Sequence, residues 1–214
     1  MATEAGTEVR LPDLRGFMNP NSYDHIAEKW HSEKRGFQAR KYVDLAIQGL
    51  DAGSRILDLG CGTGAPIAQY LIQQGFTVVG VDGSSKMLEI AGQVVPEAKL
   101  IQSDIVNVNI DERFNAVIAW DSIFHIDRTH HEAIFRKVFE LLEPQGRLLL
   151  SAGGTGEVGF TSEMHGHTFY YSGYDPAETL DLLRGVGFRI AFWEVDDPSS
   201  KGHIAVVASK IACT

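Results

Sequence analysis

The sequence predicts a doubly wound α/β fold with a mostly parallel seven-stranded sheet. Seven short apolar runs rich in β-branched residues are typical of strands; they lie at 55–59, 76–81, 99–102, 114–120, 147–151, 188–195 and 203–209. Helical stretches separate most of these runs, and such alternation indicates a parallel sheet covered on both faces. The last two runs are joined only by the turn-rich segment DDPSSKG, so we expect them to pair antiparallel as a hairpin.

The helical stretches follow from apolar spacing and from helix-end signals. Residues 1–20 are polar and rich in Pro and Gly, and predict an irregular arm before a single domain at 21–214. Residues 21–50 predict two helices broken near Gly36. Trp193, within a strand run, is expected in the core. Four further helices are expected near 65–74, 84–92, 130–142 and 175–185.

The amino-acid composition favours some classes of function over others. The chain has 214 residues, of which 44% are hydrophobic and 22% charged, which suits one globular domain. We expect a cytoplasmic protein, because we find neither a secretory signal nor an apolar run long enough to cross a membrane. Cys61 and Cys213 form no disulfide framework or zinc site, and no metal is expected. A net charge of −9 disfavours nucleic acid and suits a small organic substrate or another protein.

The stretch RILDLGCGTG at 55–64 carries the first chemical signal. A predicted strand runs into Gly60, Gly62 and Gly64, and a helix follows near Ala65-Pro66. Such glycines allow a sharp turn and a close approach of the backbone to a ligand at the carboxyl end of the strand. The spacing lacks the third glycine of a dinucleotide fingerprint, and the Gly-Lys-Ser/Thr of a phosphate loop is absent. Taken alone, the loop is also compatible with a tight turn that binds nothing.

Acidic residues at the next two strand ends strengthen the interpretation. Asp82 ends the second predicted strand, 24 residues after Asp58, where an acid in a βαβ unit accepts hydrogen bonds from ribose hydroxyls. Asp104 lies just past the third strand and is suitably placed to accept from an adenine amino group. Three consecutive strand ends therefore predict a nucleoside-binding edge of the sheet.

The segments DLGCGTG, VDGSSKML and SDI resemble the first three motifs of the class I S-adenosylmethionine-dependent methyltransferases. The resemblance runs from about residue 22 to the C-terminus. It implies a Rossmann-like sheet of seven strands with an antiparallel last strand, in agreement with the predicted terminal hairpin. It also implies S-adenosylmethionine as cofactor, with S-adenosylhomocysteine as the product.

The resemblance also implies positions for the cofactor. Asp58 and the Gly60 backbone would face its methionine end, and Asp82 would hold the ribose hydroxyls. The segment YDHIAEKW resembles the N-terminal helix that many small-molecule members fold over the cofactor. The other implied contacts are Tyr23 and Trp30 in that helix, Cys61, Gly62 and Gly64 along the loop, Gly83, Ser84 and Met87 beside the adenosine, and Asp104 and Ile105 at the adenine.

The end of the fourth strand, AWDSIFHI, would lie nearest the methyl group, with Trp120, Asp121 and Ser122 as its inner wall. The Asn/Asp-Pro-Pro-Tyr sequence of enzymes that methylate adenine or glutamine is absent, which again points to a small molecule. Methyl transfer from a positive sulfur relies mainly on positioning. His125 is the candidate general base, and the alternative is that it packs beneath the loop.

A glycine-rich stretch at 153–174 predicts either a substrate lid or a hairpin-like insertion with tyrosines on the surface. Candidate substrate contacts there are His165, His167, Tyr170 and Tyr171, and Ser122 joins them from the fourth strand. His165 and His167 are weak evidence for a metal, because no acidic or cysteine set accompanies them.

The sequence thus predicts an enzyme that methylates a small molecule. The alternative is an S-adenosylmethionine-binding protein with a non-methylating role, as a cyclase, isomerase or regulatory subunit. A nicotinamide-dependent reductase is disfavoured, because the third glycine and a Tyr-x-x-x-Lys pair are both absent. The sequence predicts neither the methylated atom nor the oligomeric state.

Overall fold

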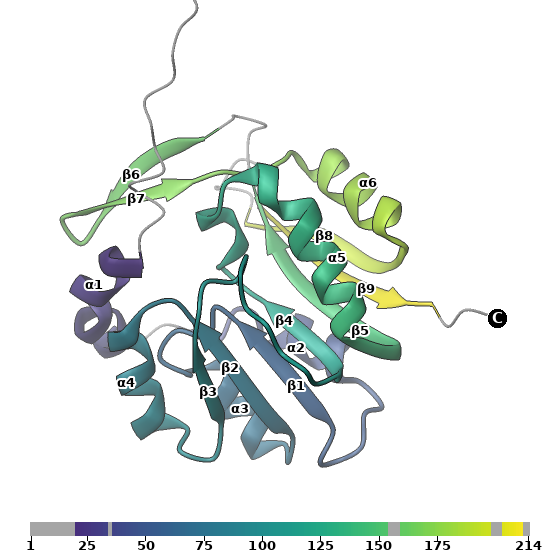
Figure 1. Ribbon diagram of the computed structural model, residues 1–214, viewed down its shortest axis with the longest axis horizontal. Coiled ribbons are helices and arrows are strands. Elements are labelled where there is room, and N and C mark those ends of the chain that lie inside the picture. The colour runs from purple at the N-terminus through teal and green to yellow at the C-terminus, as the bar shows by residue number, and fades with distance from the viewer. Residues whose placement is uncertain (1–19, 34–35, 154–158, 198–202, 212–214) are drawn as a thin grey trace, which may run out of the picture.

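The computed structural model describes residues 20–33, 36–153, 159–197 and 203–211. A seven-stranded sheet with the order β3-β2-β1-β4-β5-β9-β8 forms its centre (Figure 1). The strands are β1 (Arg55–Leu59), β2 (Thr77–Asp82), β3 (Lys99–Gln102), β4 (Phe114–Ala119), β5 (Leu142–Ala152), β8 (Phe188–Asp197) and β9 (His203–Lys210). The arm predicted at 1–20 lies outside the described residues except for Pro20, which begins the first helix.

The sheet is parallel from β3 through β5, and β9 runs antiparallel to both β5 and β8. The predicted doubly wound sheet and the antiparallel pairing of the last two strands are therefore confirmed. Because β1 lies between β2 and β4, the chain leaves β1 toward one edge of the sheet and later resumes toward the other. Ligands of open α/β sheets bind at such a switch point, outside the carboxyl ends of the strands.

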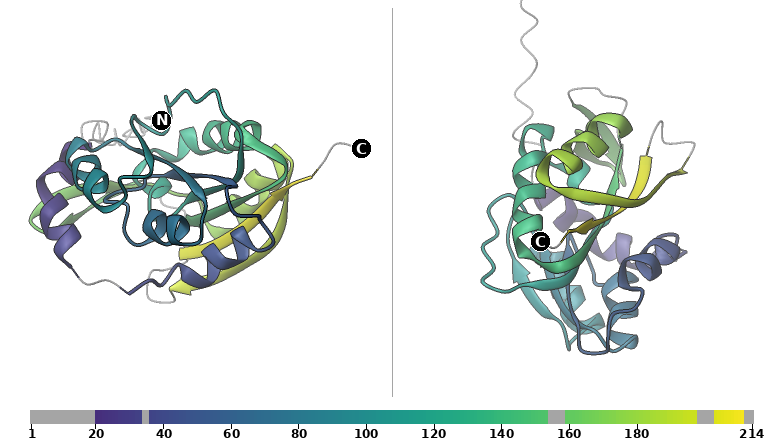
Figure 2. Two further views of the ribbon diagram at one scale, coloured as in Figure 1. Left: turned by 90° about the horizontal axis from the view of Figure 1, so that it is seen from below. Right: turned by 90° about the vertical axis from the view of Figure 1, so that its right-hand side faces the viewer.

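Helices cover both faces of the sheet (Figure 2). Along β4, Val117 and Ala119 pack in the cluster that contains residues of α5 and α6, and Ala116 and Ile118 pack in the cluster with α2 and α3. This alternation is what a strand buried on both faces requires. The helices are α1 (Pro20–Ser32), α2 (Arg40–Ile47), α3 (Ile67–Gln73), α4 (Ser85–Val94), α5 (His131–Leu141) and α6 (Pro176–Val186). All six predicted helices are present, and in the described ranges none could cross a membrane.

Two expectations are corrected. β5 begins at Leu142 and not at 147, because the register shifts opposite Phe114 and Ala116, and Gln145 takes a left-handed φ of 68° within that irregularity. Leu142 thereby pairs with β4 before the predicted run begins. Trp193 is not in the core but 47% exposed, because β8 is an edge strand whose alternate side chains face away from the sheet's packed side.

The glycine-rich stretch after β5 forms a separate antiparallel hairpin of β6 (Phe160–Met164) and β7 (His167–Tyr171). Figure 1 shows this hairpin beside α1, at the same end of the molecule as α4. Tyr170 is only 3% exposed, so it does not lie on the surface as the hairpin interpretation expected. Residues 154–158 of the predicted lid lie outside the described ranges.

Candidate functional site

A cavity of about 730 Å³ opens at the carboxyl ends of β1, β2 and β4. Its floor is the glycine loop after β1, and α1 and β7 close it with Tyr23, Trp30, Phe169 and Tyr170. It brings together residues that lie far apart in the sequence. Those of the sequence-predicted set that line it are Tyr23, Trp30, Asp58, Gly60, Cys61, Gly62, Asp82, Gly83, Ser84, Met87, Asp104, Ile105, Trp120, Asp121, Ser122, His125 and Tyr170.

The three glycines of the loop after β1 all have positive φ, between 54° and 81°. A Cβ on Gly60 would lie 2.3 Å from the Cβ of Ser122, and one on Gly64 would lie 2.6 Å from Val95. Gly64 thus serves the packing of the loop on α4 and does not line the cavity. At Gly62 a Cβ would meet nothing within 4 Å, so a ligand can approach the backbone there. The Cys61 thiol instead packs toward Gly80.

Asp82 connects this loop to the next helix. Its Oδ2 accepts the backbone N–H of Gly62 at 2.9 Å, and its Oδ1 accepts the backbone N–H of Ser84 at 2.8 Å. Burial raises the pKa of the Asp82 carboxyl, and the two backbone hydrogen bonds oppose that rise. Each carboxylate oxygen can accept a further hydrogen bond. The arrangement suits a ligand that presents two neighbouring hydroxyl groups.

The helix α1 is held over the cavity by Asp24, which sequence reasoning missed. Its Oδ1 accepts from the Ser84 hydroxyl at 2.5 Å and from the backbone N–H of Lys86 at 3.0 Å. The Ser84 hydroxyl in turn accepts from the Met87 N–H and caps α4. An acid in the middle of a helix gives no sequence signal for such a contact, because its partners lie some 60 residues away.

His125 joins the two walls that close the cavity. Its Nδ1 lies 2.9 Å from the carbonyl oxygen of Tyr170, and its Nε2 lies 2.7 Å from the Tyr23 hydroxyl. A carbonyl oxygen only accepts, so Nδ1 carries the proton and Nε2 accepts from Tyr23. Burial lowers the pKa of His125, so the neutral form is favoured at neutral pH.

The family can now be stated. Residues 56–146 match the methyltransferase domain family. A protein of Geobacillus sp. (strain WCH70) that is named a methyltransferase is 34% identical over 201 residues, which cover 87% of this chain and 74% of the relative. The chain belongs to the methyltransferases.

Solved structures agree with this family in fold. The complex of DhpI with S-adenosylhomocysteine superposes with a TM-score of 0.71 at 20% identity, over 93% of this chain and 99% of that one. The [4+2]-cyclase SpnF superposes with a TM-score of 0.67 at 17% identity, over 91% and 95%. With the class I motifs of the sequence, the family and the fold make S-adenosylmethionine the cofactor of this methyltransferase.

The cavity of the methyltransferase suits this cofactor chemically. The Ser122 hydroxyl oxygen is buried beside Gly60 and has no hydrogen-bond partner among the described residues, so a bound ligand would satisfy it. Asp58, 2% exposed, lies at the end of β1 and offers a carboxylate to a cationic ligand group. Asp104 is exposed, and its carboxylate accepts from the Val106 N–H and the Asn107 side-chain amide.

Three of the predicted substrate contacts do not line the cavity of the methyltransferase. His165 lies 3.3 Å from Glu33, His167 stacks on His25, and Tyr171 stacks on Phe160. The hairpin runs along α1, so its turn and outer side chains meet that helix and one another, while Phe169 and Tyr170 reach the cavity. Across the described part of the chain, no group of three His, Cys, Asp or Glu residues could hold a metal ion.

Asp58 gives the stability of the ligand-free methyltransferase a defined pH dependence. Burial, followed by the charge of Asp82, raises the Asp58 pKa from 3.8 to about 7. The folded state then holds a proton that the unfolded state releases, so the free energy of unfolding falls as the pH rises from about 4 to 7, by at most about 4 kcal/mol.

Asp58→Asn should flatten this decline in urea unfolding measured across that pH range. Asp51→Asn, at an exposed loop position before β1, is the matched control and should leave the decline unchanged. An equally steep decline in Asp58→Asn would contradict the assignment.

Proposed function

We propose that this methyltransferase transfers the methyl group of S-adenosylmethionine to a small-molecule acceptor. The observation that carries the proposal is the cavity of about 730 Å³, a volume within the range of small-molecule sites. Its outer walls are aromatic side chains of α1 and β7, which suit a compact organic acceptor better than a polymer. The free thiol of Cys61 suits a reducing, cytoplasmic compartment.

The lining residues at the ends of β1, β2 and β3 would hold the cofactor. Asp82 would accept from the ribose hydroxyls, since each of its oxygens keeps a lone pair after its backbone bond. Asp58 and the Gly60 backbone would face the methionine part, and the open backbone at Gly62 would lie along the path of the cofactor. The adenosine would lie against the lining residues that follow β2 and β3, which are Gly83, Ser84, Met87, Asp104 and Ile105.

When bound, S-adenosylmethionine supplies a methyl group on a positively charged sulfur, which is already activated toward a nucleophile. The protein then needs chiefly to hold the acceptor in line and to exclude water. Tyr23, Trp30 and Phe169 would do so, because α1 and β7 close over the cavity and pack ring against ring. Trp120 supports the inner wall by stacking on Tyr42, with 5.3 Å between the two ring centroids.

His125 reaches the cavity through Tyr23. Both ring nitrogens are engaged by protein atoms, which agrees with a packing role. A proton relay uses the same contact: the Tyr23 oxygen takes the proton of the acceptor while its own proton passes to Nε2 of the neutral His125. The acceptor atom keeps the freed electron pair for its new bond to carbon. A tyrosine that bridges base and acceptor would thus let a buried histidine act.

A role without methyl transfer is the second candidate, because the cyclase SpnF shares the fold. The two candidates differ in product. With labelled S-adenosylmethionine and the low-mass fraction of a cell extract, we expect the label to enter a small molecule as S-adenosylhomocysteine forms, measured by mass spectrometry. Label confined to protein or nucleic acid would contradict the small-molecule proposal. Tight cofactor binding with no product in any fraction would favour the second candidate.

Asp82→Ala should weaken S-adenosylmethionine binding about 100-fold or more in titration calorimetry. The change removes hydrogen bonds to a charged acceptor, each contributing about 1.5–3 kcal/mol. Asp51→Ala, an aspartate at an exposed position preceding β1, is the control and should bind normally. Unchanged affinity in a folded Asp82→Ala protein would refute the ribose assignment.

The variants Tyr23→Phe and His125→Gln should distinguish a proton relay through Tyr23 from a role of His125 in packing alone. If the relay operates, Tyr23→Phe lowers kcat about 100-fold at pH 7 with unchanged thermal stability, and the loss shrinks at high pH, where the acceptor ionises unaided. If His125 only packs, both variants lower the melting temperature and leave kcat of the folded fraction within about twofold of the wild type.

A further inference from the structure

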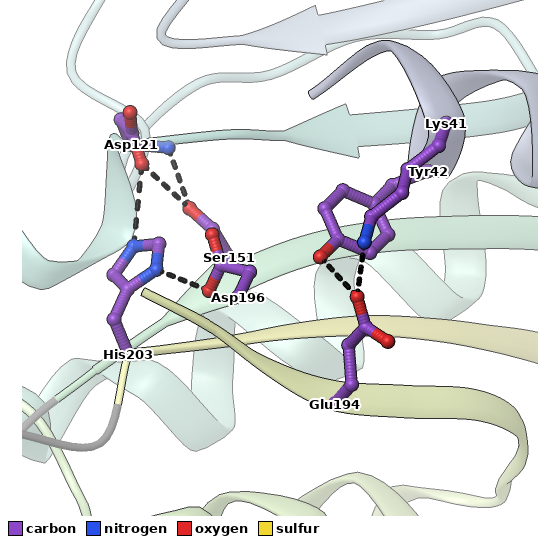
Figure 3. Close-up of polar contacts among 7 residues, drawn as sticks. All are labelled: Lys41, Tyr42, Asp121, Ser151, Glu194, Asp196 and His203. Atoms are coloured by element: carbon purple, nitrogen blue, oxygen red, sulfur yellow. Dashed lines mark hydrogen bonds and ion pairs between the residues drawn. The ribbon is translucent and has the colours of Figure 1, made fainter. Parts of the chain in front are cut away.

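A cluster of charged and polar side chains adjoins the inner wall of the cavity at Asp121. Its other members come from β5, β8 and β9, which lie on the opposite side of β1 from Asp82, and Figure 3 shows their contacts. The cluster begins at Asp121, which follows β4 and has a left-handed φ of 49°. The Asp121 backbone N–H donates to the Ser151 hydroxyl at 2.7 Å, and that hydroxyl donates to Asp121 Oδ1 at 3.1 Å. Ser151 is fully buried in β5, so the backbone and carboxylate of Asp121 are fixed against a rigid strand.

His203, the first residue of β9, extends the cluster to the edge of the sheet. Its Nε2 lies 3.3 Å from Asp121 Oδ1, and its Nδ1 lies 2.6 Å from Asp196 Oδ1 in β8. The His203 and Asp196 side chains are only 16% and 13% exposed. Asp121, Ser151, Asp196 and His203 are called the Asp121 cluster below.

His203 carries a positive charge at neutral pH. Burial lowers its pKa, but hydrogen bonds and charges of Asp121 and Asp196 outweigh the burial and raise the pKa to about 9. The rings of Trp120 and Phe124 also face the imidazole, and neither is charged. The imidazolium therefore bridges two carboxylates, and their combined charge leaves the Asp121 cluster with one net negative charge.

The two oxygens of Asp121 have different surroundings. Oδ1 takes the bond from Ser151 and the ion pair with His203, and no contact holds Oδ2 among the residues that the structure describes. The Asp121 side chain is 51% exposed and lines the cavity. A left-handed backbone is unfavourable for an aspartate. The contacts at Oδ1 offset that cost and aim the carboxylate.

We propose that Asp121 orients the methyl acceptor by accepting a hydrogen bond at Oδ2 from its hydroxyl or amine group. His203 and Asp196 are positioning residues for this carboxylate. The inference rests on the proposed function and names the class of acceptor. The acceptor bears an O–H or N–H group and is neutral or cationic, because a carboxylate would be repelled by Asp121 and would have no hydrogen to donate.

Glu194 provides a matched control. It lies two residues before Asp196 on the same face of β8 and accepts hydrogen bonds from Tyr42 and Lys41 (Figure 3). Like Asp196 it is a carboxylate in a polar contact between elements, but it does not line the cavity or reach Asp121. Glu194→Gln therefore tests the loss of a β8 carboxylate without disturbing the Asp121 cluster.

The test uses three probes of one skeleton, benzyl alcohol, benzylamine and benzoate, with the full chain loaded with S-adenosylhomocysteine. Probe binding is measured by ligand-observed NMR and cofactor binding by calorimetry. We expect the wild type and Glu194→Gln to bind the alcohol and the amine at least tenfold more tightly than benzoate. Asp121→Asn should lose most of the preference for the amine over benzoate, while the affinity for S-adenosylhomocysteine stays within about twofold.

The pH dependence of probe binding distinguishes a positioning role of His203 and Asp196 from a role in protein stability alone. Benzyl alcohol does not titrate, so a fall in its binding above about pH 9 would report deprotonation of His203. Asp196→Asn should move this fall to lower pH, because one of the two carboxylates that raise the His203 pKa is gone. His203→Gln should weaken alcohol binding at all pH values and abolish the fall.

Three results would overturn the proposal. The first is an Asp121→Asn protein that binds the probes like the wild type, and the second is a wild type that prefers benzoate or binds none of the probes. The third is a loss of cofactor affinity in Asp121→Asn large enough to make Asp121 a cofactor contact. The proposed function fails separately. If the probes behave as expected but labelled S-adenosylmethionine gives no methylated product, Asp121 is a hydrogen-bond acceptor for a small ligand and methyl transfer to a small molecule is refuted.

Discussion

The bridge that Asp82 makes between Gly62 and Ser84 is the interaction on which the rest of the cavity depends. It ties the loop after β1 to the start of α4, so two neighbouring strand ends act as one rigid surface. Ser84 then passes the constraint to Asp24, and with it to α1. A carboxylate with free lone pairs therefore both builds the floor of the cavity and remains able to bind a ligand.

The opposite wall depends on His125. The same imidazole contacts Tyr23 of α1 and the Tyr170 carbonyl of β7, so helix and hairpin are fixed relative to each other. Burial keeps that imidazole neutral, which its two hydrogen bonds require. The cavity thus has two chemically different parts: an aromatic wall lies under α1 and β7, and carboxyl groups line the strand ends at Asp58, Asp82 and Asp121. This division suits a cationic cofactor beside an organic acceptor.

Much of the fold could be predicted, because its signals are local. Apolar runs and turn residues located all seven strands of the sheet, and the turn between the last two correctly indicated antiparallel pairing. The predicted start of β5 was wrong, since the irregularity at Gln145 depends on pairing with β4. The prediction that Trp193 lies in the core was wrong for a related reason: the order of the strands in the sheet, and not composition, makes β8 an edge strand. His165 and His167 lie outside the cavity lining, and no local pattern indicates this because the hairpin's direction along α1 is a tertiary contact.

The sequence by itself determined the order of the strands along the chain, the glycine loop and the acids at three successive strand ends, and these indicated the family and its cofactor. Those features are encoded within single segments and their immediate neighbours. The tertiary structure alone decided which side chains close the cavity and which oxygen of Asp121 is held. Asp24 with Ser84, Tyr23 with His125, and Asp121 with His203 are pairs 60 to 102 residues apart. No local pattern specifies such pairs, because the packing of separate elements creates them.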